Sequence, residues 1–360
     1  MPEKGSTQMA LLNFALYAAI ATLTFYLLIV GKALILPFVV AIVFWYMIAT
    51  LARLYGRAGT WGMRMPSWLA TVFAVLTFVA LLSGFIDLTR DNISQVVAVA
   101  PIYQANLENL AERLVTLTGY HIPTLDQVME QVDLGAMAGT LASSLTAFAG
   151  NVGIILVYVI FLLFEQKGFA AKLDAIVTDP ARRERVRSTL RRINGDVRTY
   201  IWVKTVLSVA TGSISYAVMR LVGLDFAEFW AVVIFLLNFI PTIGSILGIV
   251  FPTLLALVQF PDDLTPFLVV LVCLGATQVI TGNVVEPRMM GRSLNLSPLV
   301  IILSLAVWGS IWGVIGMFLS VPITVIAMIV MAQFQVTRPL AIMLSSDGIV
   351  SGDPERREIA

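Results

Sequence analysis

Charge, histidine and cysteine are all scarce in this 360-residue sequence, and each scarcity narrows what the chain can be. Charged residues make up 12% of the chain, about half the share in ordinary soluble domains, while 59% of the residues are hydrophobic. The single cysteine, Cys273, excludes a disulfide within the chain. The single histidine, His121, excludes the paired histidines of a zinc-dependent intramembrane protease. We therefore expect no metal site, and a net charge of +1 gives no general attraction for nucleic acid.

Motifs for nucleotide binding and catalysis are also missing from the sequence. No G-x-x-x-x-G-K-[ST] loop is present to hold the phosphates of ATP. No aspartate lies in the middle of an apolar run, which excludes a pair of intramembrane catalytic aspartates. The sequence therefore predicts a protein that is not an enzyme and needs no cofactor.

Long apolar runs make up most of the sequence. A helix of about 20 apolar residues crosses the hydrocarbon core of a bilayer and satisfies its own backbone hydrogen bonds there. The predicted fold class is therefore all-α, a polytopic helical membrane protein embedded in the lipid bilayer. The runs of suitable length are 9–30, 33–51, 66–88, 147–164, 201–221 and 266–282.

Two apolar stretches, 227–260 and 298–333, are too long for one span. Each has about 35 residues, which as a single helix would reach about 50 Å. Their centres, residues 238–244 and 309–316, read NFIPTIG and GSIWGVIG, and proline and glycine at such positions interrupt a helix. We expect about six full spans plus two broken helical hairpins. A pair of short full spans in each stretch is the alternative, with the same sidedness.

Charge distribution predicts the orientation, because cytoplasmic loops of membrane proteins are rich in Lys and Arg. Residues 53–64 hold three arginines and no acid, and residues 165–204 hold ten basic residues against five acidic ones, so both are expected in the cytoplasm. Residues 87–133 hold seven acidic residues and are expected outside. Hairpin 227–260 should then open from outside and hairpin 298–333 from inside, with both termini cytoplasmic.

The chain is expected to divide into five parts. These are the N-terminal spans 1–88, an external helical segment 89–146, a span with a cytoplasmic basic helix 147–200, a C-terminal transport region 201–340 and a cytoplasmic tail 341–360.

Both extramembrane segments have helical signals. In the external one, leucines recur every three or four residues and suit packing within the chain or between subunits; they are Leu107, Leu110, Leu114 and Leu117. Thr124 and Gln127 form a capping box. The basic helix, which begins after Asp179, is expected to lie along the inner lipid headgroups.

Charged residues at membrane depth are costly and indicate functional sites. Glu286 lies in the short segment 282–292 together with Arg288 and Arg292. Its two expected roles are an ion pair with one of these arginines and a part in transport. Lys204 lies near a span end, where we expect its charge to reach water.

Uncharged polar residues and helix-breaking residues complete the predicted site. Broken helices expose carbonyl and amide groups that bind substrates or ions, although the glycines equally suit helix packing. The predicted outer tip consists of Asn238, Pro241, Thr242 and Gly244, and the inner tip of Gly309, Ser310, Trp312 and Gly313. Gln278 and Asn283 are further candidates for binding, and Glu286 and Arg288 for gating.

These motifs resemble those of the bacterial autoinducer-2 exporter family of multi-spanning permeases. The likeness covers nearly the whole chain and is strongest in its C-terminal half. It rests on the 238–244 motif, on Pro252, Glu286-Pro287, Gly291, Leu296 and Pro298, and on the run LSLAVWGSIWGVIGMFLSVPIT.

The resemblance implies an inner-membrane homo-oligomer, a pentamer in this family, that exports small polar solutes such as autoinducer-2. It also implies sodium(lithium)/proton antiport as an alternative, with Na⁺ or H⁺ as coupling ion and Glu286 as the titrating carboxylate. An elevator-like movement of the hairpins is expected by analogy. A structural or channel-like oligomer without coupled transport is the third alternative.

Overall fold

The computed structural model describes residues 3–57, 65–118, 134–166, 168–291 and 295–349. Within these ranges the chain is helical apart from turns and one isolated bridge between Leu296 and Ser345. Five helices are long and apolar enough to cross a membrane, or six when the bent end of one helix and the helix after it count as one span. The predicted all-α, polytopic membrane class is confirmed.

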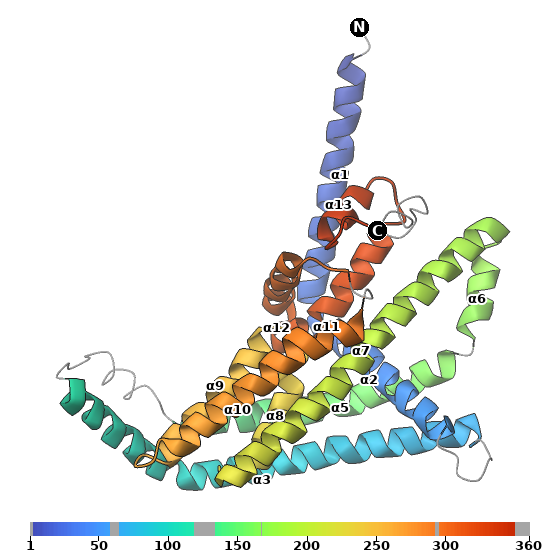
Figure 1. Ribbon diagram of the computed structural model, residues 1–360. Coiled ribbons are helices and arrows are strands. Elements are labelled where there is room, and N and C mark those ends of the chain that lie inside the picture. The colour runs from blue at the N-terminus through green and yellow to red at the C-terminus, as the bar shows by residue number, and fades with distance from the viewer. Residues whose placement is uncertain (1–2, 58–64, 119–133, 167, 292–294, 350–360) are drawn as a thin grey trace.

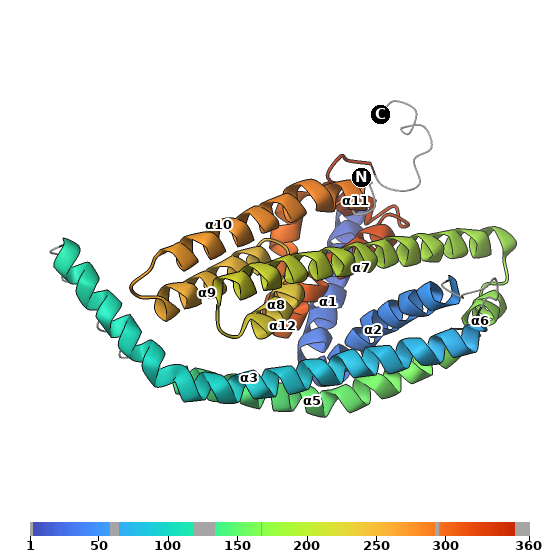
Figure 2. The same cartoon turned by 60° about the horizontal axis from the view of Figure 1, so that its bottom comes forward.

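The described residues of the N-terminal half form the helices α1 (Glu3–Val30), α2 (Lys32–Arg57), α3 (Ser67–Thr118) and α5 (Leu134–Glu165). Helices α2, α3 and α5 pack together around small and branched side chains such as Ala41, Ala74 and Val159. Helix α1 diverges from α2 in both views (Figures 1 and 2). Its large apolar side chains between Leu12 and Val30 are mostly exposed, as expected of a helix that meets lipid or another subunit.

Helix α3 continues without interruption across the expected boundary at residue 88. Its far part contacts the C-terminal half through two hydrogen bonds. The Tyr103 hydroxyl donates to Asp225 Oδ2 at 2.6 Å, and the Asn106 amide donates to the Val258 carbonyl at 3.0 Å. The capping box at Thr124 and the leucine side chains of the predicted stripe lie outside the described part of the chain.

After the short helix α6 (Phe169–Ile176), the basic segment and the next span form one helix, α7 (Pro180–Val222). Asp179 caps it by accepting hydrogen bonds from the N–H groups of Ala181 and Arg182. No break separates the basic half from the apolar half, so the basic half continues the axis of the apolar half (Figure 2). Its location along the lipid headgroups stays a prediction.

The first over-long stretch is broken at its centre, as predicted. Helix α8 (Ala227–Leu237) ends before residues 238–242, and α9 (Ile243–Gln259) follows. A Cβ on Gly244 would lie 1.7 Å from the Leu237 carbonyl oxygen, although residues seven apart in a helix are separated by about 10 Å. The chain therefore folds back on itself, and we name residues 227–259 hairpin 1.

The second stretch, α12 (Pro298–Met331), also folds back, at a glycine. Gly313 has φ 64° and ψ −144°, a conformation that is essentially restricted to glycine. A Cβ on Gly316 would lie 1.9 Å from the Trp308 carbonyl oxygen, which requires a reversal of direction. We name residues 298–331 hairpin 2; the short helix α13 (Arg338–Leu344) follows it.

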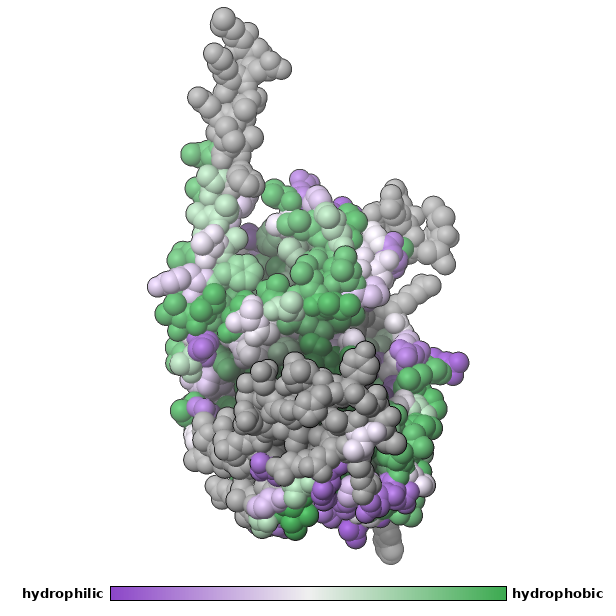
Figure 3. All heavy atoms as spheres, turned by 90° about the vertical axis from the view of Figure 1, so that its left-hand side faces the viewer, coloured by the Kyte–Doolittle hydropathy of each residue, from purple (hydrophilic) through white to green (hydrophobic). Residues whose placement is uncertain are grey.

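Between the hairpins, α10 (Thr265–Ile280) leads into a π-helical turn, η2 (Thr281–Val285), and a short helix, α11 (Glu286–Met290). Helices α7 to α10 share a core that includes Met219, Ile234, Ala256 and Leu274. Large apolar side chains remain exposed on these helices, and apolar residues cover much of the described surface on the face in Figure 3. Such a surface suits a lipid environment.

Candidate functional site

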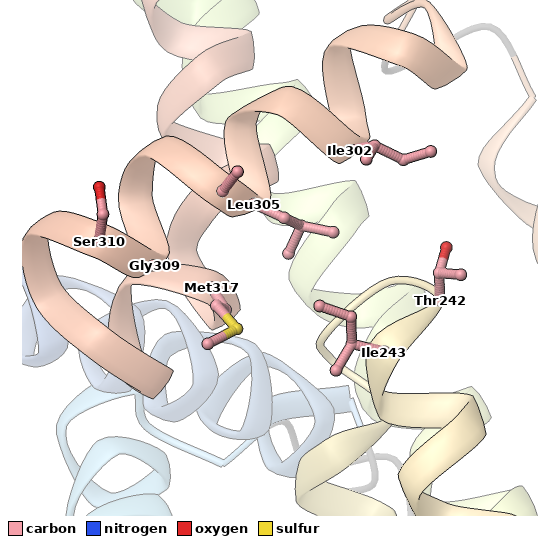
Figure 4. A pocket seen from close by; sticks show the side chains of 8 residues that line it. Thr242, Ile243, Ile302, Leu305, Gly309, Ser310 and Met317 are labelled. Carbon is pink, nitrogen blue, oxygen red and sulfur yellow. The ribbon is translucent and has the colours of Figure 1, made fainter.

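The tips of the two hairpins meet around a cavity of about 430 Å³ (Figure 4). Hairpin 1 contributes Thr242 and Ile243 at the start of α9. Hairpin 2 contributes residues from both of its limbs: Ile302, Leu305, Ala306, Gly309, Ser310 and Met317. The cavity walls are almost entirely apolar, and Thr242 and Ser310 lie at its edge with their hydroxyl groups pointing away from its centre (Figure 4). Three residues of the predicted site, Thr242, Gly309 and Ser310, are brought together here.

The tip of hairpin 1 contains a strained turn. The N–H of Ile243 donates to the Pro241 carbonyl at 2.6 Å, so residues 241–243 form a γ-turn. Thr242, at its centre, has φ 63° and ψ −60°, the rare and strained form of this turn. A β-branched residue in this region costs on the order of 1–3 kcal/mol, which only a surrounding structure that fixes the turn can offset. The γ-turn places an exposed threonine at the edge of the cavity (Figure 4).

The tip of hairpin 2 is closely packed by its own returning limb. Met317 Cγ lies 3.0 Å from the position of a Cβ on Gly309, so a larger residue at 309 would collide with it. The Ser310 hydroxyl donates to the Val307 carbonyl at 2.8 Å. Trp312 is buried away from the cavity, and its indole N–H donates to the Leu28 carbonyl of α1 at 3.0 Å. Trp312 therefore ties hairpin 2 to α1 and does not line the cavity.

A buried ion pair lies beside the tip of hairpin 1. Lys204 Nζ on α7 is 2.6 Å from Glu286 Oε1 at the start of α11, and the two side chains are 3% and 22% exposed. The same ammonium donates to the Asn238 carbonyl at 3.2 Å. The neighbouring Phe239 carbonyl accepts a hydrogen bond from the Tyr200 hydroxyl at 3.3 Å. Two residues of α7 therefore hold two carbonyl groups that α8 leaves unpaired where it ends.

The expected surroundings of Lys204 and Glu286 need correction. Lys204 does not reach water, because the helix continues past it and the tip of hairpin 1 covers it. Glu286 pairs with Lys204 instead of Arg288, which is exposed. The other predicted partner, Arg292, lies outside the described residues.

Buried polar side chains continue along α7 from Lys204. Ser208, Thr211 and Ser215 follow it at helical spacing and are at most 1% exposed. The Ser208 hydroxyl accepts a hydrogen bond from Asn238 Nδ2 at 3.1 Å. Within the described part of the chain, Thr211 Oγ1 on α7 has no hydrogen-bond partner. We name these residues, with Lys204, the α7 stripe.

Helices α9 and α10 contribute further buried polar groups next to this bundle. Gln278 is 5% exposed, and its Nε2 packs against Gly248 of α9. Gln278 Oε1 and Thr253 Oγ1 have no hydrogen-bond partner among the described residues. Asn283, in η2, is exposed and is not among the residues that line the cavity.

Sequence reasoning missed Lys204, Tyr200 and the α7 stripe. The signal was present, because polar residues recur at spacings of four, three and four within an apolar run. A polar row on one face of an apolar helix indicates a buried polar interface. The partner, Glu286, lies 82 positions further along the chain, and no local pattern joins the two.

Apolar outer surfaces, folded-back helices and a cavity between their tips define the class of a membrane transport protein. The chain belongs to the AI-2E transporter family, because residues 14–335 match the family described as AI-2E family transporter. As a member of a transporter family, it is not an enzyme.

Individual relatives agree with this assignment. The chain is 28% identical over 318 residues to the AI-2 transport protein TqsA of Escherichia coli (strain K12), covering 87% of this chain and 89% of TqsA. It is 30% identical over 290 residues to the putative transport protein YhhT of the same organism, covering 79% of this chain and 80% of YhhT. A putative transport protein of Borreliella burgdorferi is 30% identical over 237 residues, covering 66% of this chain but less than two thirds, 62%, of that relative.

Proposed function

We propose that this protein is a secondary transporter of the bacterial inner membrane that exports a small polar solute by alternating access. The meeting of the two hairpin tips around one cavity carries this proposal. The relative named AI-2 transport protein suggests autoinducer-2 as the solute. The hydroxyl groups of Thr242 and Ser310, at the edge of the cavity, would contact such a solute as it enters, while the apolar walls exclude water from it.

In this mechanism the two hairpins and α10 move as the gates, and α1 to α5 form the scaffold of a homo-oligomer, a pentamer by family resemblance. Hairpin 1 opens to the outside and hairpin 2 to the cytoplasm, which contains both termini. The ends of hairpin 1 lie together, since the Gln259 amide donates to the Gly223 carbonyl, which supports a segment that returns to the side it came from. Leu296, before hairpin 2, bridges Ser345, which follows α13. Glu286 and Arg288 would control access to the inner hairpin.

Flux measurements in membrane vesicles test the proposal. Pro241→Ala removes the rigid residue that begins the γ-turn, and Gly313→Leu places a side chain where φ is 64°. Because Pro241→Ala loosens the strained turn and Gly313→Leu adds backbone strain on the order of 1–3 kcal/mol, we expect export of autoinducer-2 to fall by about tenfold in each variant, with the oligomer intact. Gly275→Ala is the control, since nothing lies within 4 Å of its added Cβ. Unchanged export in both tip variants contradicts the gating role of the hairpins.

Sodium(lithium)/proton antiport is the second candidate, and the buried carboxylate of Glu286 favours it. It predicts a sodium-dependent pH change in proteoliposomes that Glu286→Gln abolishes. A pH change that persists in Glu286→Gln assigns proton exchange to another group, and its absence from the wild type at every pH rejects antiport.

A further inference from the structure

The ammonium group of Lys204 contacts oxygen atoms that belong to two other segments of the chain. Glu286 Oε1 lies 2.6 Å from Nζ and the Asn238 carbonyl oxygen 3.2 Å from it. The carboxylate comes from the start of α11, and the carbonyl comes from the C-cap of α8. Among the described residues, no other charged side chain forms an ion pair with Lys204 or Glu286, and Arg288, two positions along α11, is exposed.

These oxygen atoms form the kind of ligand set that binds a monovalent cation. The C-terminal end of a helix carries a partial negative charge, and its last carbonyl groups have no partners within the helix. In transporters with broken helices, such carbonyl groups and nearby carboxylates coordinate coupling ions. Here α8 ends beside Lys204, and the next carbonyl, that of Phe239, is held by Tyr200. The site is therefore suited to one positive charge.

Lys204 supplies this charge from within the chain. A covalently attached ammonium does not leave the site, so a free ion competes with it at a large disadvantage. The positive charge of Lys204 is needed because the Glu286 carboxylate, away from bulk water and without a partner, would strongly destabilise the fold. Lys204 is 3% exposed, which leaves its side chain no route to water in this arrangement.

We propose that Lys204 is a tethered cation that fills a monovalent-cation site formed by Glu286 and the Asn238 carbonyl. The wild-type protein then binds no sodium or potassium at Glu286. Removal of the lysine side chain converts the position into a site for a small free cation. This inference concerns the charge balance at the tip of hairpin 1. It holds whichever polar solute the protein exports, and it excludes sodium binding at Glu286 in the antiport alternative.

Thermal unfolding of the purified full-length protein tests the proposal. The melting temperature, Tm, is measured in sodium, potassium or methylammonium chloride, each against choline chloride at equal concentration, since choline is too large for the site. We expect the Tm of the wild type to be the same in all four salts. The Tm of Lys204→Ala should be lower in choline and should rise by about 3 °C or more in at least one of the small cations.

Two variants serve as controls. Lys204→Ala/Glu286→Gln removes both charges, so we expect it to fold and to show no response to small cations. Lys172→Ala removes a lysine that pairs with Glu165 on the exposed surface, and it too should show no response. A response in this variant assigns the effect to general salt binding and overturns the proposal.

Further outcomes contradict the proposal. A folded Lys204→Ala protein with the same Tm in all four salts shows that no cation site is formed. If Lys204→Ala does not fold, the wild type decides the question: a Tm that rises in sodium over choline, and that Glu286→Gln abolishes, places a free ion at Glu286 and overturns the proposal. Export assays are not part of these readouts, so a wrong solute assignment leaves them unaffected.

Discussion

Gly244 and Gly316 hold corresponding positions in the two hairpins. In each, an added Cβ would lie within 2 Å of a backbone carbonyl oxygen of the opposite limb, at Leu237 or at Trp308. A backbone carbonyl group cannot move aside to make room for a methyl group, whereas the end of a flexible side chain can. These glycines therefore allow the chain to reverse direction over a few residues.

We expect Gly244→Ala and Gly316→Ala each to lower the free energy of unfolding by about 2 kcal/mol or more, because the limbs must separate to admit the methyl group. Chemical or thermal unfolding of the purified protein measures the effect. Gly275→Ala on α10 is the matched control. Nothing lies within 4 Å of its Cβ, so it should be neutral or stabilising by up to about 1 kcal/mol. Equal stability of the three variants would show that the hairpins are looser than their geometry indicates.

Two buried hydroxyl groups have no hydrogen-bond partner within the described residues. They belong to Thr211 in the α7 stripe and to Thr253 on α9. A buried polar atom without a partner costs about 1–3 kcal/mol. We therefore expect Thr211→Val and Thr253→Val to raise the free energy of unfolding by about 1 kcal/mol. Thr205→Val is the control, because the Thr205 hydroxyl already donates to the Ile201 carbonyl at 2.7 Å and its removal offers no such gain.

Transport by the same valine variants gives a second measurement. Groups kept at a cost to stability commonly serve function. Export should therefore fall in Thr211→Val or Thr253→Val although the protein is more stable. A gain in stability with full export would assign these hydroxyls no part in transport.

At the scale of whole elements, the far part of α3 is fixed to the open end of hairpin 1, where its two limbs begin and end. Tyr103 donates to the Asp225 carboxylate, which precedes α8, and Asn106 donates to the Val258 carbonyl near the end of α9. Burial, and secondarily the hydrogen bond and charge of Asp225, raise the pKa of Tyr103 above its ordinary value. The hydroxyl therefore keeps its proton and remains a donor.

Removal of this hydroxyl should weaken the attachment of α3. We expect Tyr103→Phe to lower the free energy of unfolding by about 1.5–3 kcal/mol, the usual range for a hydrogen bond to a charged group. The comparison is Tyr158→Phe, whose ring packs edge-on against Phe38 and whose hydroxyl has no hydrogen bond within the described residues. A loss of the same size in both variants would mean that the Asp225 contact adds nothing specific.

The sequence predicts which segments are helical better than it predicts how far each helix continues. Pro241 and the glycines near 313 mark both reversals, because backbone conformation is a local property. The continuity of α3 past residue 88 and of α7 from Pro180 was not foreseen, since a change from apolar to charged residues alters the surroundings of a helix without ending it. The Lys204–Glu286 pair depends on tertiary packing and has no local signal.

For the molecule as a whole, the positions of the hairpin ends relative to the membrane follow from the proposed sidedness. In a Cys273→Ser background, we expect Leu221→Cys and Leu264→Cys, which flank hairpin 1, to react with a membrane-impermeant thiol reagent from one side. Val336→Cys, which follows hairpin 2, should react from the other side. All three positions are well exposed. Labelling of positions 221 and 264 from opposite sides would show that hairpin 1 crosses the bilayer completely.

Because hydrogen bonds join α7 to the tip of hairpin 1, a displacement of the tip is transmitted along α7. Lys204 and Tyr200 bind the tip, and the 43 residues of α7 form one uninterrupted rod. From Lys204 the rod extends about 36 Å to its first residue. A tilt of about 5° at the tip would therefore swing the arginine-rich end by about 3 Å. Spin labels attached at that end would therefore report a movement of the tip of hairpin 1, the proposed gate, from outside the packed part of the protein.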